Sequence, residues 1–137
     1  MSLLGVFDVA GSAMSAQSIR LNTVSSNLAN ADTASSSTDR TYRSRQPVFA
    51  TAMQAFSDDP SHAGVRVTGI VESKEELRMR YEPSHPMANE NGYIYLPNVN
   101  VVEEMANMIS ASRSYQNNVE AMNTSKQLLQ ATLRLGQ

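Results

Sequence analysis

The stretch LLGVFDVAGSAMSAQSIRLNTVSSNLANA, residues 3–31, decides the fold class of this chain. Its largest apolar side chains recur every seven residues, and they are Phe7, Met14, Leu21 and Leu28. A second row, three or four residues from the first, consists of Leu3, Ala10, Gln17, Val24 and Ala31. Residues three and four apart share one face of an α-helix, so the stretch predicts a long N-terminal helix whose seam faces a partner helix.

The partner is expected at the other end of the chain, where residues 101–135 carry the same seven-residue spacing. One row consists of Val101, Met108, Tyr115, Met122 and Leu129, and the interleaved row of Met105, Ser112, Val119, Lys126 and Leu133. Asn98 or Asn100 is expected to cap this helix at its start. Glutamates at 103 and 104 suit its first turn, and Gly136 is expected to end it. The two helices are predicted to pair as an antiparallel, coiled-coil-like layer.

The residues between the two helices have a different pattern. Residues 33–41 lack an apolar period and predict a loop. Extended or β-prone segments follow at residues 42–49, 65–67, 77–81 and 93–96, with turns expected at 58–60 and at Asn91–Gly92. We therefore expect a mainly α fold with a small β unit. Its parts are an N-terminal helix (1–32), an extended loop and small β region (33–98) and a C-terminal helix (99–137).

Composition narrows the class of protein. The 137 residues carry a formal net charge of −2, so no basic surplus favours nucleic acid as a partner. No apolar run approaches the roughly 20 residues that span a bilayer, so a membrane-integral protein is not expected. The N-terminus lacks a basic segment and Asp8 interrupts its apolar run, so any export should proceed without a cleaved signal peptide. Cysteine is absent, which excludes disulfides and thiolate metal sites.

The N-terminal stretch is poor in charge. Up to residue 32 it holds only Asp8, Arg20 and Asp32, fewer than a helix with one face in water usually carries. Opposite the main row lie small or mildly apolar side chains, namely Val9, Ser12, Ala13, Ala16, Ile19 and Thr23. Its second half contains weak helix formers, so packing partners must stabilise it. We expect this helix to pack on several sides.

No group of residues predicts catalysis, and no cofactor, metal or small-molecule substrate is expected. His62 and His85 lie in loop-like segments without a second histidine at ligand spacing, and a rigid turn is the favoured interpretation for His85. Glu103 and Glu104 point about 100° apart on a helix, so they are expected to be surface charges rather than an acid–base pair. The protein is therefore predicted not to be an enzyme.

Three arginines surround Tyr42, and they are Arg40, Arg43 and Arg45. With Asp39 adjacent and the run short, they favour a solvated or salt-bridged loop. A subunit contact is the alternative.

The apolar rows admit two interpretations: an internal core within one chain, or an interface between subunits. The two interpretations are compatible, because some residues of the rows can form the internal core while others form the interface. The uncharged back face of the N-terminal helix and the lack of a large core elsewhere favour assembly. The predicted interface residues are Leu3, Phe7, Ala10, Met14, Leu21, Val24, Leu28, Val101, Met105, Met108, Tyr115, Val119, Met122, Leu129 and Leu133.

Several segments resemble the bacterial flagellar axial proteins, the superfamily of rod and hook subunits. Residues 21–33, LNTVSSNLANADT, are similar to its Asn-Leu-Ala-Asn signature. Residues 81–86 (YEPSHP), 91–93 (NGY), 96–105 (LPNVNVVEEM) and 112–115 (SRSY) are similar to the C-type subunit of the proximal rod. The resemblance covers nearly the whole chain and is weakest over residues 50–64.

This resemblance implies a structural subunit of the flagellar basal-body proximal rod. Such a subunit assembles with copies of itself and with other rod proteins into a hollow helical shaft that transmits motor torque. It is expected to reach the periplasmic part of the basal body through the flagellar type III export apparatus. The residues themselves leave one alternative, a soluble helical-hairpin adaptor or export chaperone that binds an amphipathic helix.

Overall fold

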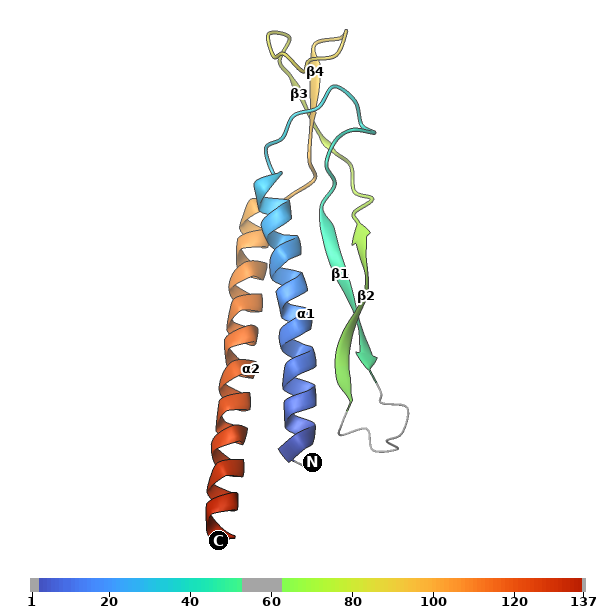
Figure 1. Ribbon diagram of the computed structural model, residues 1–137. Helices are drawn as coiled ribbons and strands as arrows, with labels where there is room; N and C mark the ends of the chain where they lie inside the picture. The colour runs from blue at the N-terminus through green and yellow to red at the C-terminus, as the bar shows by residue number, and fades with distance from the viewer. Residues whose placement is uncertain (1–2, 53–62, 137) are drawn as a thin grey trace.

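The computed structural model describes residues 3–52 and 63–136 (Figure 1). Two long helices, α1 (Leu3–Ala29) and α2 (Val101–Leu135), run side by side in opposite directions. Between them in sequence come β1 (Arg45–Ala52), β2 (Gly64–Glu72), β3 (Arg78–Tyr81) and β4 (Tyr93–Leu96). The mainly α fold with a paired helix layer and a small β unit is thus confirmed. The turn expected at residues 58–60 and the side chain of His62 lie outside the described residues.

The β residues form two separate antiparallel sheets of two strands each. β1 pairs with β2 from Arg45 opposite Glu72 to Ala52 opposite Gly64. The register shifts between Val48 and Phe49, which is the signature of a β-bulge and bends the ribbon locally. β3 and β4 pair at the end of the molecule beyond the helices (Figure 1).

Helix α1 lies between α2 and the β1–β2 ribbon (Figure 1). The hydroxyl of Ser12 donates to the Val9 carbonyl (2.9 Å) and accepts from the Val65 N–H (3.1 Å), which joins the helix to β2. A Cβ atom on Gly64 would lie 2.7 Å from the same hydroxyl oxygen, so only glycine allows this close approach. The small back face of α1 therefore packs against the chain's own ribbon.

Helix α2 begins directly after Asn100, whose side chain caps its first turn. The side-chain oxygen of Asn100 accepts from the N–H groups of Val102 (3.2 Å) and Glu103 (3.4 Å), so Asn100 is the N-cap. The helix continues to Leu135, and the N–H of Gly136 donates to the Thr132 carbonyl (3.2 Å). Within the described residues, neither helix combines the length and the apolarity that crossing a membrane requires.

Gly92 makes the turn between β3 and β4 possible. Its φ of 79° lies in the left-handed region, and its N–H donates to the Asn89 carbonyl (2.9 Å). A Cβ at this position would approach the Tyr81 ring to 2.8 Å. The Asn91–Gly92 turn that the sequence predicted is therefore confirmed.

We expect Gly92→Ala to lower the free energy of unfolding by about 1–3 kcal/mol, because the new methyl group meets the Tyr81 ring in a strained backbone conformation. Urea denaturation of the purified variant measures the loss. Gly69→Ala is the matched control, since nothing lies within 4 Å of a Cβ there. Equal losses in both variants would contradict the steric explanation.

Candidate functional site: the helix faces and the polar junction

The predicted rows of α1 are covered within the chain. Ala10 and Val24 are buried, and the row Phe7, Met14, Leu21 and Leu28 is half-buried. The helix begins at Leu3, whose side chain is not among those described. Packing inside one protomer thus accounts for much of this pattern.

Helix α2 faces α1 with a row that differs from the predicted pair. Its buried residues are Glu104, Ala111 and Ser125, which are seven or fourteen residues apart and share one face. Met108, Met122 and Leu129 of the predicted rows flank this face and are half-buried, as is Val119. Four other predicted residues are exposed, namely Val101, Met105, Tyr115 and Leu133. Fewer of the large apolar side chains of α2 are therefore buried against α1 than predicted. Small and polar residues occupy the centre of the contact between the helices instead.

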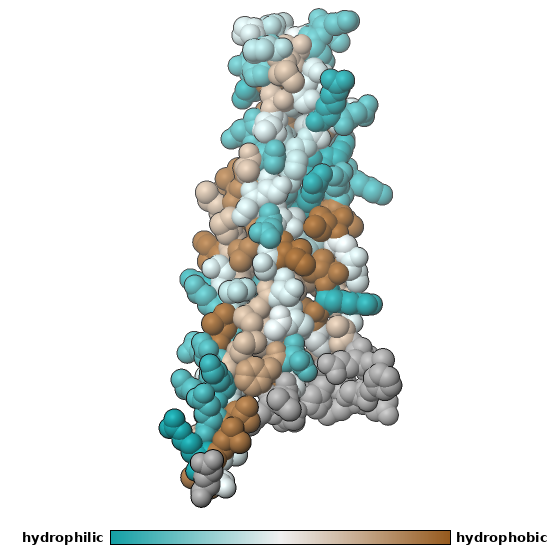
Figure 2. All heavy atoms as spheres, viewed as in Figure 1, coloured by the Kyte–Doolittle hydropathy of each residue, from teal (hydrophilic) through white to brown (hydrophobic). Residues whose placement is uncertain are grey.

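The outer face of α2 carries large apolar side chains. Val102, Met105 and Ile109 are 77%, 55% and 55% exposed, and their spacing of three and four residues aligns them over the first turns. We call these three residues the outer stripe. Further exposed leucines near the other end of α2 are Leu128, Leu133 and Leu135. Figure 2 shows brown apolar side chains over the helices and over the neighbouring β1–β2 ribbon, interspersed with white and teal ones, whereas the end with β3 and β4 is mostly hydrophilic. Contiguous exposed apolar surface of this kind marks an interaction site.

A buried polar junction joins the end of α1 to the start of β1. Asn27 is fully buried, and its Oδ1 accepts from the Arg45 N–H (2.9 Å) and the Tyr42 hydroxyl (2.8 Å). Its Nδ2 donates to the Arg45 carbonyl (2.8 Å) and to Ser44 Oγ (3.4 Å). The amide thus pairs with both backbone groups of Arg45 as a neighbouring strand would. We call Asn27, Tyr42, Ser44, Arg45 and Asn98 the polar junction.

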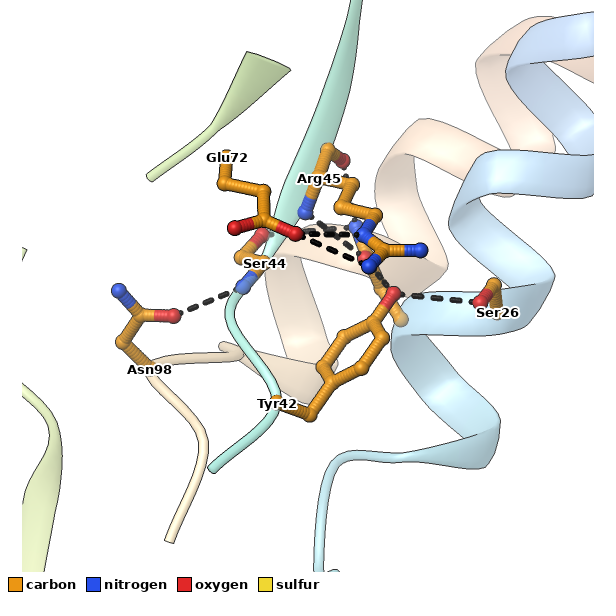
Figure 3. Close-up of polar contacts among 7 residues, drawn as sticks. Ser26, Tyr42, Ser44, Arg45, Glu72 and Asn98 are labelled. Carbon is orange, nitrogen blue, oxygen red and sulfur yellow. Dashed lines mark hydrogen bonds and ion pairs between the residues drawn. The ribbon is translucent and has the colours of Figure 1, made fainter. Parts of the chain in front are cut away.

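Asn98 links the polar junction to the start of α2, and Arg78 adds further hydrogen bonds beside it. Asn98 Oδ1 accepts from the Ser44 N–H (2.8 Å), as Figure 3 shows, and its Nδ2 donates to the Glu75 carbonyl (3.0 Å). The guanidinium of Arg78 donates to the carbonyls of Ala31 (2.9 Å) and Pro97 (3.0 Å). These bonds fix the end of α1 relative to the start of α2, and no motif in the sequence indicated them.

The arginines around Tyr42 are engaged within the chain. Arg45 forms an ion pair with Glu72 (2.9 Å) and lies over the Tyr42 ring, 5.3 Å from its centroid (Figure 3). Arg43 donates to the carbonyls of Ser73 (3.3 Å) and Glu75 (3.1 Å). The salt-bridged interpretation is confirmed for Arg45, and a subunit contact by these residues stays a prediction.

The prediction that Glu104 is a surface charge is wrong. Its residue surface is only 4% exposed, because its position on α2 turns it toward α1 and the polar junction. Burial raises the pKa of Glu104; the neighbouring Asn27 amide opposes this, Glu103 adds to it and Arg20 opposes it. Its Oε2 accepts no hydrogen bond from the described part of the chain. A buried carboxylate oxygen without a donor is costly, which agrees with the raised pKa of Glu104.

Glu104→Gln should raise the free energy of unfolding at neutral pH. A carboxyl group whose pKa is higher in the folded chain destabilises that chain as pH rises from the ordinary carboxyl pKa, about 4.3, through the raised value. Below that range both states are protonated and the advantage of glutamine disappears. Urea denaturation of both proteins across this pH range tests the sign. The same gain for Glu103→Gln, at an exposed neighbour, would contradict the role of burial.

Within the described part of the chain, the histidine and acidic side chains do not gather into one site. His85 Nδ1 accepts from the Met87 N–H (3.0 Å) within a turn. Over residues 3–52 and 63–136, no three His, Cys, Asp or Glu side chains gather as metal ligands. The feature that calls for a function is therefore a surface, namely the outer stripe.

An antiparallel helix pair formed by the two ends of a chain, with apolar side chains left exposed on one helix, is typical of a subunit that packs into a larger assembly. Both ends match families of that class. The model "Flagella basal body rod protein" matches residues 7–34, and "Flagellar basal body rod FlgEFG protein C-terminal" matches residues 90–135.

Relatives of full length narrow this class further. The chain is 50% identical to flagellar basal-body rod protein FlgC of Yersinia enterocolitica and 47% identical to that of Salmonella typhimurium, with all of both chains covered in each case. It is 34% identical to FlgC of Borreliella burgdorferi, over 98% of each chain. The chain belongs to the FlgC family of flagellar basal-body rod proteins.

Proposed function

We propose that this chain is a structural, non-enzymatic subunit of the flagellar basal-body rod, specifically of its proximal part. It assembles there with copies of itself and with other rod proteins into a hollow helical shaft that transmits motor torque. The full-length similarity to FlgC proteins supports the rod assignment, and it does not favour the adaptor or chaperone alternative.

The single observation in the structure that carries this proposal is the outer stripe. Val102, Met105 and Ile109 are more than half exposed on a helix whose other face is already paired with α1. Covering the exposed part of each such side chain stabilises an assembly by about 1–2 kcal/mol, so we propose that a neighbouring subunit covers it. Four residues of the predicted interface are exposed, namely Val101, Met105, Tyr115 and Leu133, and we propose that neighbouring subunits cover these as well. The predicted interface residues that are already covered belong to the protomer's own core.

The polar junction suits a subunit under mechanical load. It ties α1, β1 and the start of α2 together through directional hydrogen bonds, so the helix pair and the β region resist relative displacement. Torque passed between subunits then reaches the whole protomer.

The route to the rod follows from the same assignment. We propose export by the flagellar type III apparatus to the periplasmic part of the basal body, without a cleaved signal peptide. A chain without cysteine forms no disulfides that would resist unfolding during passage.

Deleting the gene and restoring it tests the proposal. We expect the deletion strain to lose swimming, the restored strain to regain it, and the chain to be present in purified basal bodies. A chain that stays in the cytoplasm as a small stable oligomer, and is absent from basal bodies, would instead support the adaptor.

A further inference from the structure

The outer stripe lies on the side of α2 that faces away from α1. At about 100° per residue, Val102, Met105 and Ile109 are about 100–160° around the helix from Glu104, which is buried against α1. All three side chains are more than half exposed. A surface that covers the stripe must therefore approach α2 from the side opposite α1.

A cleft of about 300 Å³ lies on the other side of the helix pair, between α1 and the β1–β2 ribbon. Its opening is accessible, since Ile70 of β2 is 52% exposed. The α1 residues in it are about 100–160° around that helix from Val24, which lines a pocket together with Glu104 and Asn107 of α2. We call it the ribbon cleft, and the residues that line it are Ile19, Asn22, Thr23, Ser26, Arg45 and Ile70.

The part of α1 beside the ribbon cleft exposes only small or uncharged side chains. They are Ser15, Ser18, Asn22 and Ser25, which are three or four residues apart and share one face. A neighbouring helix can come close to this face without taking a charged group out of water. The ribbon cleft and its surroundings thus suit an apolar helix face such as the outer stripe.

The outer stripe and the ribbon cleft lie at the same level along the helix pair. The cleft spans residues 19–26 of α1, and the stripe spans residues 102–109 of α2, so each covers about 10 Å at 1.5 Å per residue. Arg20 and Asn107 fall within these two ranges and are hydrogen-bonded to each other (3.0 Å). A copy that stands beside the protomer in the same orientation therefore presents its stripe at the level of the cleft.

Charges further along the two surfaces are complementary. Glu120 continues the line of the outer stripe in steps of three and four residues, and a Cβ atom on Gly11 would lie 4.0 Å from the nearby Met122 Cε. Arg66 follows the β2 residue whose N–H donates to Ser12, next to Gly11. Both charged side chains are exposed, and neither forms an ion pair within the described residues. The stripe side thus carries an acid at the level where the ribbon side carries a base.

Resting on the proposed function, we propose that the outer stripe of one copy of this chain packs into the ribbon cleft of a second copy that stands beside it in the same orientation. The stripe and the cleft are on opposite sides of the helix pair, so one protomer cannot make this contact with itself. Two different surfaces meet in it, so each added copy leaves a stripe or a cleft free for the next. The contact therefore joins copies side by side around the shaft.

Cysteine cross-linking tests the contact without background, since the chain contains no cysteine. Asn22→Cys places a thiol at the rim of the ribbon cleft, and Ala106→Cys places one beside the outer stripe at the same level. We expect mild oxidation of basal bodies with this double variant to give covalent dimers on a non-reducing gel. Each single variant should give none.

A matched pair tests the level of the contact. Gln130 is also exposed on α2, but it lies about 36 Å along the helix from Ala106 at 1.5 Å per residue. Asn22→Cys combined with Gln130→Cys should therefore give no dimer. Equal dimer yields from the two double variants would overturn the proposed arrangement.

The outcomes separate this inference from the proposed function. Basal bodies that contain the Asn22→Cys, Ala106→Cys variant but give no dimer, or give only an adduct with a different rod protein, overturn the contact and leave the proposed function intact. Absence of the wild-type chain from basal bodies overturns the proposed function itself.

A second measurement covers the case in which the double variant is not incorporated. Ile70 lines the ribbon cleft, whereas Val71, which is 53% exposed, points to the opposite face of the ribbon. We expect Ile70→Asp to reduce the number of assembled rods at least about tenfold and Val71→Asp to retain most of them. Normal rod assembly by Ile70→Asp, or an equal loss in both variants, would overturn the contact at the ribbon cleft.

Discussion

Asn27→Ala is expected to lower the free energy of unfolding by about 3 kcal/mol or more, the largest loss we expect from a single side chain in the protomer. The substitution leaves the N–H and carbonyl groups of Arg45 without their Asn27 partner, and it leaves the hydroxyl of Tyr42 with its Ser26 Oγ contact (3.2 Å) alone. Each buried polar group without a partner costs about 1–3 kcal/mol, so several such losses add up to much of a small domain's stability. Urea denaturation of the purified variant measures the change, and swimming should be lost with it.

Asn30→Ala is the matched control, because it removes the second asparagine of the same Asn-Leu-Ala-Asn segment. The Asn30 side chain is half-buried and donates to the Ser26 carbonyl (2.8 Å) within its own helix end. We expect its loss to cost about 0.5–1.5 kcal/mol, as for an ordinary hydrogen bond. Equal costs for the two variants would show that the bonds of Asn27 to Arg45 carry no special stability.

Ile109→Asp is expected to abolish rod assembly and swimming while leaving the purified chain folded. Ile109 is 55% exposed in the protomer, so aspartate is tolerated there. In the proposed rod the same position is covered by a neighbour, where a buried charge without a partner costs several kcal/mol per subunit. Swimming assays, the yield of rods and urea denaturation of the free chain together measure both effects.

Two variants make this prediction specific. Ile109→Leu keeps the apolar side chain and should swim normally. Met108→Asp lies one position away on the half-buried side that flanks α1, so we expect it to lower the free energy of unfolding of the free chain as well. If Ile109→Asp destabilised the free chain as strongly as Met108→Asp, the assignment of Ile109 to an intersubunit face would be wrong.

The sequence was sufficient to predict the two helices and their pairing. The seven-residue spacing predicted the two long helices and their pairing. The asparagines before Val101 predicted a cap at Asn98 or Asn100, and the structure shows that Asn100 is the cap. Asn91–Gly92 gave the turn before β4, because the left-handed backbone there favours glycine. These features depend on local chemistry, which a sequence displays directly.

The seam of α2 could not be predicted in the same way. Its centre is Glu104, Ala111 and Ser125, whose small or polar side chains carry no apolar signal. The large side chains beside them gave the stronger pattern, and Met105 and Leu133 of that pattern face outward. A pattern of apolar residues does not distinguish a face covered within the chain from one covered by a neighbour.

The role of Asn27 was also beyond local reasoning. An asparagine among weak helix formers is a signal of a polar contact, but its partner Arg45 lies 18 residues away across a loop. The burial of Glu104 follows from the same junction, because the side chain points at α1 near Asn27 rather than into water. Both depend on how the end of α1, the start of β1 and the start of α2 meet in space.

A density map of purified basal bodies at side-chain resolution tests the central claim most directly. We predict that the map places this chain in the rod with Val102, Met105 and Ile109 in contact with a neighbouring subunit. A rod in which these three side chains face water would contradict the account.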